Sequence, residues 1–183
     1  MKADITAALV TEHLLIKRML ALIERFAPLT ATGQFSDWQF YLDGVDFIRH
    51  YADRFHHAKE EDVLFEALVA NGMPRQNSPV AAMLMEHDQG RLYVQAMEAG
   101  ALKAAAGEAG QEKLIAENAR AYAALLREHI SREDEILYPL AERVLPEAVR
   151  PAITAGYRRA EAAVGTDFTA RYTRIVAGYE QRA

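Results

Sequence analysis

The sequence predicts an all-α protein: an antiparallel up-down four-helix bundle, built from two repeated helical hairpins, with a helical extension at its C-terminus. Apolar residues recur at helical spacing through four long segments that short connectors join. Neither the alternation of a β-strand nor a hairpin dipeptide competes with this pattern. Motifs of the first half of the chain return in the second half, which predicts two copies of one helical hairpin.

The first hairpin is predicted to hold two long helices. The first helix runs over about residues 4–27 and ends before Pro28, and its apolar seam, spaced alternately by four and three residues, includes His13. The second helix begins at the cap Ser36 and continues to about Ala70, where an Asn-Gly pair ends it.

The second hairpin is predicted to repeat this plan. Its first helix begins at the cap Ser78, with Pro79 in the first turn, and ends within the alanine- and glycine-rich stretch 100–110. Its second helix follows an apolar seam over residues 115–140, again spaced by four and three. Pro139 is expected to kink or end this helix, because proline lacks a backbone N–H and clashes with the preceding turn.

We therefore divide the chain into a bundle, residues 1–145, and a C-terminal extension, residues 146–183. The extension holds a short helix-like piece from Glu147 and a last helix over residues 167–180, in which apolar residues recur at spacings of four and three. Such a helix is expected to pack on the bundle or on a second subunit. In the second case the protein would be a homodimer.

Composition narrows the function classes. The chain of 183 residues has a net charge of −5, which provides no basic surface for nucleic acid or for an anionic membrane. It has no cysteine, which excludes disulfides, thiolate zinc sites and cysteine-ligated iron–sulfur clusters. It shows neither a run of 18 apolar residues nor a signal segment. We expect a cytoplasmic protein.

A histidine followed four residues later by a glutamate occurs in both predicted hairpins, as His56 with Glu60 and as His129 with Glu133. On a helix this spacing places the two side chains on one face, a turn apart. Both copies lie on the apolar seam, so their side chains are expected to point into the bundle.

Another histidine lies on the helix before each motif, and six polar side chains converge if the hairpins pack about a pseudo-two-fold axis. The six are His13, His56, Glu60, His87, His129 and Glu133. A buried carboxylate costs several kcal/mol unless a proton or a cation neutralises it. Two carboxylates that face four imidazoles therefore predict a site for two divalent ions, with open positions for water or a small ligand.

Each of these residues alone has a purely structural interpretation. A single histidine on an apolar seam is usually a hydrogen-bonded core residue, and a glutamate beside another acidic residue usually lies on a solvated face. The matched spacing in both hairpins favours the metal site. Imidazole ligands suit iron, zinc, copper and nickel. Ferritin-like bundles use Glu-x-x-His, with the carboxylate first and a shorter spacing, and so differ from this motif.

Over about residues 5–142 these motifs resemble the hemerythrin-like, or HHE cation-binding, domain family. The resemblance implies a non-haem di-iron centre inside a four-helix bundle, with an oxo or hydroxo bridge between two iron ions. It also implies the ligands: His13 and His56 for one iron, His87 and His129 for the other, with Glu60 and Glu133 as bridges. Zinc or another divalent metal is the alternative to iron.

The sequence departs from the oxygen-carrying hemerythrins at two places. Those proteins have another histidine one turn after the third-helix histidine, where this chain has Arg91. They also have an aspartate five residues after the last histidine, where this chain has Glu133 at four. Both differences indicate the bacterial six-ligand branch and argue against reversible oxygen carriage.

Four neighbouring side chains are left outside the predicted ligand set. His57 aligns with Ile130 of the second hairpin, so we expect it beside the metal site, although an alignment shift of one residue would exchange the two adjacent histidines. His50 is expected at the surface or behind a ligand, and Tyr122 in the core. Arg91 would either steer an anion to the site or extend into solvent.

The leading hypothesis is a di-iron protein that binds or reacts with dioxygen, peroxide or nitric oxide, in an oxidative or nitrosative stress response. The alternatives are a module that senses iron or oxygen without turnover, and a protein that repairs or supplies iron centres. Known repair proteins of this type carry an additional domain that contains cysteine. This chain has no cysteine, which makes the repair function the weaker hypothesis. The sequence does not decide whether the protein is an enzyme.

Overall fold

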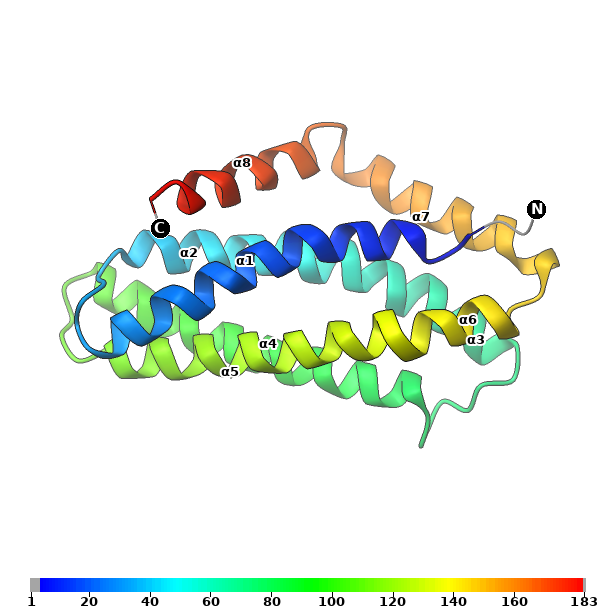
Figure 1. Cartoon of the computed structure of the whole chain (residues 1–183), viewed down its shortest axis with the longest axis horizontal. Helices are drawn as coiled ribbons and strands as arrows, with labels where there is room; N and C mark the ends of the chain where they lie inside the picture. The colour runs from blue at the N-terminus through cyan, green and yellow to red at the C-terminus, as the bar shows by residue number, and fades with distance from the viewer. Residues whose placement is uncertain (1–3, 183) are drawn as a thin grey trace.

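The structure is a computed structural model that describes residues 4–182. The described residues form helices and connecting turns, without a strand, which confirms the predicted all-α class. Long helical paths run side by side along the bundle, and two further helices cover one side of it (Figure 1).

The long helical paths have the following bounds. The first is α1, Ala7–Ala31, and the third is α4, Pro79–Ala105. The second comprises α2 Trp38–Phe47, the π-helical η1 Ile48–His57, the π-helical η2 Glu60–Phe65 and α3 Glu66–Ala70. The fourth comprises α5 Glu112–Arg132, the π-helical η3 Glu133–Leu137 and α6 Tyr138–Val144. α5 packs along both α1 and α4, and α4 also packs along α2.

Two helix starts show how the sequence sets these bounds. The Ser78 side chain accepts a hydrogen bond from the backbone N–H of Ala81, as predicted for a cap. The second path is capped by Asp37 and not by Ser36, because the Asp37 side chain accepts from the N–H of Phe40. The predicted boundary there is wrong by one residue.

Neither proline ends its helix, although an end was predicted before Pro28, and a kink or an end at Pro139. Pro28 lies in the last turns of α1, which continues to Ala31, so only one hydrogen bond near a helix end is lost. Pro139 is the second residue of α6, which continues to Val144. The π-helical η3 directly before α6 already interrupts the regular hydrogen-bond ladder there, and this makes room for the proline.

The π-helical segments η2 and η3 begin at the glutamates of the repeated motif, Glu60 and Glu133. π-Helical turns are rare and occur mostly at functional sites. Their recurrence at equivalent positions of the two hairpins indicates that the widened turns belong to the site.

Two apolar clusters fill the bundle, and the predicted metal site lies between them. On α1, Leu9 belongs to one cluster and Ile16 to the other, with His13 between the two. On the fourth path, Leu126 and Leu137 belong to different clusters in the same way. The site is therefore a polar layer with apolar walls at both ends.

The C-terminal extension folds onto the bundle of its own chain (Figure 1). It comprises the short 3₁₀ turn η4 Glu147–Val149, α7 Arg150–Val164 and α8 Phe168–Glu180. The last helix agrees with the predicted one, whereas α7 is a full helix in place of the short piece expected.

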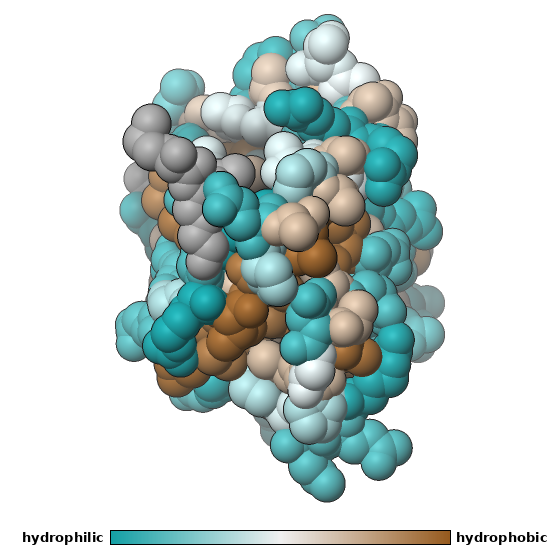
Figure 2. Space-filling model, turned by 90° about the vertical axis from the view of Figure 1, so that its right-hand side faces the viewer, coloured by the Kyte–Doolittle hydropathy of each residue, from teal (hydrophilic) through white to brown (hydrophobic). Residues whose placement is uncertain are grey.

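Aromatic residues attach α8 to the bundle. Tyr172 and Tyr179 are buried in the larger apolar cluster, and their hydroxyls donate hydrogen bonds to Asp46 at 2.9 Å and to Asp43 at 2.6 Å. At the other end, α7 buries Ile153 in the smaller cluster. Figure 2 views the molecule from that end, where apolar side chains lie among polar ones. Within the described residues, no helix has the length and hydropathy needed to cross a membrane.

Gly156 tests the packing of α7. A Cβ atom at this position would lie 2.7 Å from Cγ1 of Val63, too close for α7 to keep its place. We expect Gly156→Ala to lower the free energy of unfolding by about 1–3 kcal/mol, as overpacking does. Denaturant unfolding measures this. Gly178→Ala in α8 is the matched control, because no atom lies within 4 Å of the added Cβ. Equal effects of the two substitutions would contradict the close contact.

Candidate metal centre

The structure brings all six predicted side chains together in the interior. They come from all four helical paths, and we call them the cage: His13, His56, Glu60, His87, His129 and Glu133. Each is at most 2% exposed. Six polar side chains are therefore fully withdrawn from water at one level of the bundle, where contacts within the protein or a bound cation must satisfy them.

The imidazoles form two pairs. Nε2 of His13 lies 3.0 Å from Nε2 of His56, and Nε2 of His87 lies 3.0 Å from Nε2 of His129. The rings are inclined by 61° in the first pair and by 63° in the second. In each pair two ring nitrogens thus face one small volume, and the two volumes are related by the repeat in the sequence.

Both carboxylates face both pairs. The two oxygens of Glu133 lie 3.3 Å from Nε2 of His13 and 3.1 Å from Nε2 of His129. Oε2 of Glu60 lies 3.7 Å from Nε2 of His56 and 3.6 Å from Nε2 of His87. A carboxylate between two imidazole pairs is in the position that a bridge between two cations requires.

Three carboxylate oxygens of the cage have no hydrogen-bond partner among the described residues: Oε2 of Glu60 and both oxygens of Glu133. The imidazole nitrogens lie close to them, but these contacts do not have hydrogen-bond geometry. Buried oxygens without partners are rare and costly. A pair of cations would satisfy these oxygens and the facing nitrogens together, so the donor set fits a metal centre.

Each imidazole is oriented by a carboxylate at its second nitrogen. Nδ1 of His13 lies 2.8 Å from Asp134, Nδ1 of His56 lies 2.9 Å from Glu12, Nδ1 of His87 lies 2.7 Å from Glu61, and Nδ1 of His129 lies 2.8 Å from Glu86. An Nδ1–H that donates to a carboxylate leaves Nε2 as a lone-pair donor toward the centre. This arrangement is typical of metal-bound histidines.

A cation lies behind each of these carboxylates. Lys17 contacts Asp134, Lys59 contacts Glu12, Arg91 contacts Glu61 and Arg132 contacts Glu86. The four cations follow the histidines at equal offsets in the two hairpins, four residues after the first histidine and three after the second. Sequence reasoning did not assign this role to any of the eight residues, although the cations recur at fixed offsets from the histidines.

Tyr138 breaks the symmetry of the cage. Its hydroxyl donates a hydrogen bond to Oε1 of Glu60 at 2.5 Å and lies 3.4 Å from Nε2 of His13. The equivalent residue of the first hairpin is Phe65, which has no hydroxyl. Burial and the facing carboxylates raise the pKa of Tyr138 well above its usual value, so its proton stays available to a hydrogen bond.

The two carboxylates titrate in opposite directions. Burial and the charge of Glu133 raise the pKa of Glu60 well above its usual value. Burial would do the same to Glu133, but the facing charge of His129 outweighs it and holds the pKa of Glu133 well below its usual value. Without a cation, the cage therefore favours a proton on Glu60 and a charge on Glu133.

The imidazoles differ in the same way. Burial opposes a charge on His129, but the carboxylates of Glu133 and Glu86 outweigh it and raise the pKa of His129 to about 9. The pKa of His13 is raised too, because its two carboxylate contacts outweigh burial. His56 has no such compensation, and burial lowers its pKa well below the usual value.

The four neighbouring side chains fall in different places. His57 is buried beside His87, with one ring nitrogen near the cage. His50 lies at the surface, where Nδ1 contacts the backbone oxygen of Asp46. Tyr122 is buried in the larger core cluster. Arg91 does not enter the cage: its side chain is exposed, and acidic side chains that include Asp53 bind its guanidinium group.

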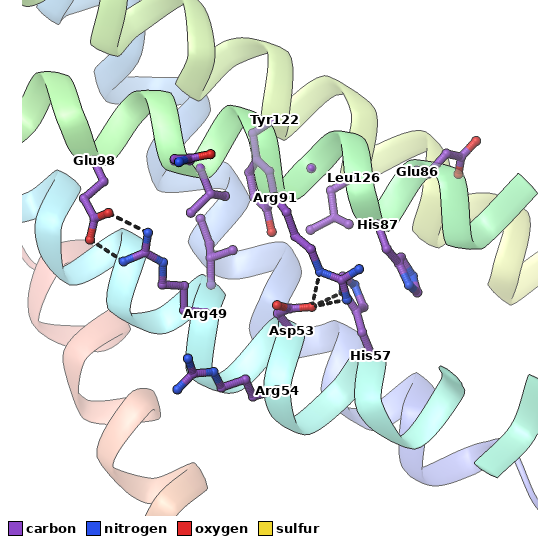
Figure 3. Close-up of a pocket in the computed structure, with 14 residues that line it drawn as sticks. Arg49, Asp53, Arg54, His57, Glu86, His87, Arg91, Glu98, Tyr122 and Leu126 are labelled. Atoms are coloured by element: carbon purple, nitrogen blue, oxygen red, sulfur yellow. Dashed lines mark hydrogen bonds and ion pairs between the residues drawn. The ribbon is translucent and has the colours of Figure 1, made fainter. Parts of the chain in front are cut away.

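A cavity of about 330 Å³ lies against the side of the cage that His87 occupies (Figure 3). His57 and His87 line it together with Tyr122, whose buried hydroxyl has no partner among the described residues. Ion pairs between Arg49 and Glu98 and between Arg91 and Asp53 also line it. This side of the site is the one that approaches the surface through open space.

The comparisons with known proteins agree with this geometry. The sequence model of the family described as the hemerythrin HHE cation binding domain matches residues 4–141 of the chain. The matched range includes the cage and all of the carboxylates and cations behind it. No curated protein and no solved structure gives a match.

The carboxylates behind the imidazoles are predicted to set metal affinity. We expect Glu86→Ala to lower the affinity for a divalent metal by about 10- to 100-fold, as loss of such a partner does elsewhere. Competition with a chelator of known affinity measures this. Glu128→Ala removes the same charge from an exposed position next to His129 and is the matched control. A Glu86 variant that binds metal as tightly as the control would show that the contact between Glu86 and His129 does not contribute to metal affinity.

Metal affinity is also predicted to depend on pH. A cation must displace the protons held by His13 and His129, whose pKa values are raised, to about 9 for the latter. Protonation of these rings is complete well below their pKa values, so the apparent affinity rises with pH and levels off above about pH 9. Chelator competition at several pH values measures the slope, and proton release on binding provides an independent check. A constant affinity from pH 6 to 9 would contradict the charge assignment.

Proposed function

Because the chain belongs to the hemerythrin HHE cation-binding domain family, we propose that it is a non-haem di-iron protein that binds or reacts with dioxygen, peroxide or nitric oxide. One observation carries the proposal. Each of two buried carboxylates faces two pairs of oriented imidazoles, and three of the four carboxylate oxygens lack a hydrogen-bond partner among the described residues. The up-down antiparallel arrangement of the four helical paths is part of the proposal, since it gives each ion one imidazole from each of two neighbouring helices.

We assign the residues of the cage the following roles in this centre. His13 and His56 would hold one ion and His87 and His129 the other, while Glu60 and Glu133 would join the two. The metal pair would supply the electrons and the open coordination position that small oxidants require. Carboxylates behind the imidazoles keep Nε2 free for metal, and the apolar clusters at both ends exclude water from the layer.

The proposal of iron rests on the family, because nitrogen and oxygen donors suit zinc and other divalent ions as well. A stress-related role is proposed on the same basis. The donor set argues against alkaline-earth ions, which prefer all-oxygen sites.

A second candidate function has its own observation. Lys59 is fully buried and joins Glu12, which orients His56, to Glu161 of α7 at 3.3 Å. A change at the metal centre could pass through this contact to the C-terminal extension. The alternative is therefore a sensor that changes the exposure of α7 and α8 without turnover. Protease cleavage of the extension that depends on the oxidation state, without consumption of oxidant, would favour this alternative.

Metal content tests the shared basis of both candidates. We expect about two irons per chain in protein made in iron-replete medium. The double variant Glu60→Ala, Glu133→Ala should hold few, because it lacks both bridges. The double variant Glu66→Ala, Glu117→Ala removes the same charge from exposed positions and should match the wild type. Wild type without metal, or a cage variant that keeps it, would refute the proposed centre.

Rapid mixing of the reduced, iron-loaded protein with each small molecule separates the candidates. An absorbance change with dioxygen, peroxide or nitric oxide, followed by repeated consumption in the presence of a reductant, supports an enzyme. A stoichiometric change that stops after one event supports binding or sensing. Absence of any spectral response to the three molecules would refute the proposed chemistry while leaving the metal site intact.

A further inference from the structure

One imidazole next to the cage has no counterpart on the other side. The ligand histidines, the carboxylates behind them and the outer cations all occur twice, at equivalent positions of the two hairpins. His57 occurs once, because Ile130 takes the equivalent place in the second hairpin. Any role of His57 at the centre therefore makes the two metal positions unequal.

His57 lies within reach of one metal position only. One of its ring nitrogens and ligand atoms of Glu60, His87 and His129 all lie within 4.8 Å of one another. The matching group on the other side consists of His13, His56 and the two cage glutamates, without a third imidazole. His57 is 6% exposed, so this nitrogen is withdrawn from solvent next to the cage.

The position of His57 relative to His87 differs from that of the paired ligands. The two rings are nearly parallel, with centroids 3.7 Å apart and an angle of 8° between them, whereas the paired ligands are inclined by 61° and 63°. To share an ion with His87, the ring of His57 must turn out of this stack. It has the freedom to do so, because Nδ1 of His57 lies 3.4 Å from Asp53. In the four histidines of the cage, Nδ1 lies only 2.7–2.9 Å from its carboxylate.

Space and charge around His57 allow this turn. The ring borders the cavity of Figure 3, so open volume lies next to it. Asp53 is itself held by Arg91, which donates from two nitrogens at 3.1 and 2.7 Å. This pair keeps a carboxylate behind His57, just as each histidine of the cage has a carboxylate at its second nitrogen.

We propose that His57 is a third imidazole ligand of the ion held by His87 and His129, and thus a seventh protein ligand of the centre. The inference rests on the proposed di-iron function. The ion held by His13 and His56 then has one protein donor fewer. The surroundings of the two ions would then differ, and the hydroxyl of Tyr138 lies 3.4 Å from Nε2 of His13 on the side with fewer donors.

Substitution of His57 by the residue of the other hairpin tests the proposal. In ⁵⁷Fe-loaded wild type we expect Mössbauer spectra with two quadrupole doublets of equal area, one for each ion. In His57→Ile one doublet moves and the other stays. A chelator should remove one iron of the variant about tenfold faster than in the wild type, while the second iron leaves at the wild-type rate.

Two further variants make the result specific. His57→Gln keeps a polar side chain beside the cavity and should give the same spectral change, so a folding defect of the isoleucine variant alone does not decide the outcome. His50→Gln removes a surface histidine of the same helical segment and should leave both doublets and both rates unchanged.

Unchanged spectra and release rates in both His57 variants would overturn the proposal and leave the six-residue centre standing. Wild type that binds no iron would instead overturn the proposed function, and with it this inference. The two failures are therefore distinguishable in the same set of samples.

Discussion

Two carboxylates in the middle of an apolar bundle, those of Glu60 and Glu133, are the constraint on which the rest of the structure depends. Both side chains are fully shielded from water, and apolar clusters close the layer at both ends. Burial of such groups without compensation costs several kcal/mol each. The bundle therefore has to supply positive charge at this level, and every polar side chain of the interior layer faces these two glutamates directly or through another residue.

Compensation proceeds outward in alternating layers. Imidazoles surround the two carboxylates, four further carboxylates hold the imidazoles, and four lysine or arginine side chains hold those carboxylates. Exposure increases along three of the four chains: Glu60 is completely buried, Glu61 behind His87 is 25% exposed, and Arg91 behind Glu61 is 40% exposed. The exception is Lys59, which is fully buried behind Glu12. The charge of the centre is thus connected to the surface through oriented hydrogen bonds, which fix the rotamers of the ligands before any cation binds.

The six cage residues could be predicted from the sequence because each lies on an apolar seam and recurs in both hairpins, so local periodicity decides where it points. The carboxylates behind them could not be assigned, because Glu12 orients His56 of the neighbouring helix and not His13 beside it. Such pairings depend on how helices cross, which no local pattern states. A helix end at Pro139, one of the two outcomes predicted there, is absent for a related reason, since the π-helical turn before the proline belongs to the site.

The departures from symmetry cluster around the centre and have a common structural context. The C-terminal extension covers the first hairpin at Lys59, where α7 places Glu161 against this fully buried side chain, while the equivalent Arg132 is 38% exposed. Tyr138 adds a hydroxyl next to His13, and His57 adds an imidazole next to His87. A strictly repeated cage would hold two identical ions. A chain that differs at these positions would give the two ions of the proposed centre unlike surroundings, so that one could exchange a ligand while the other stays coordinated by protein.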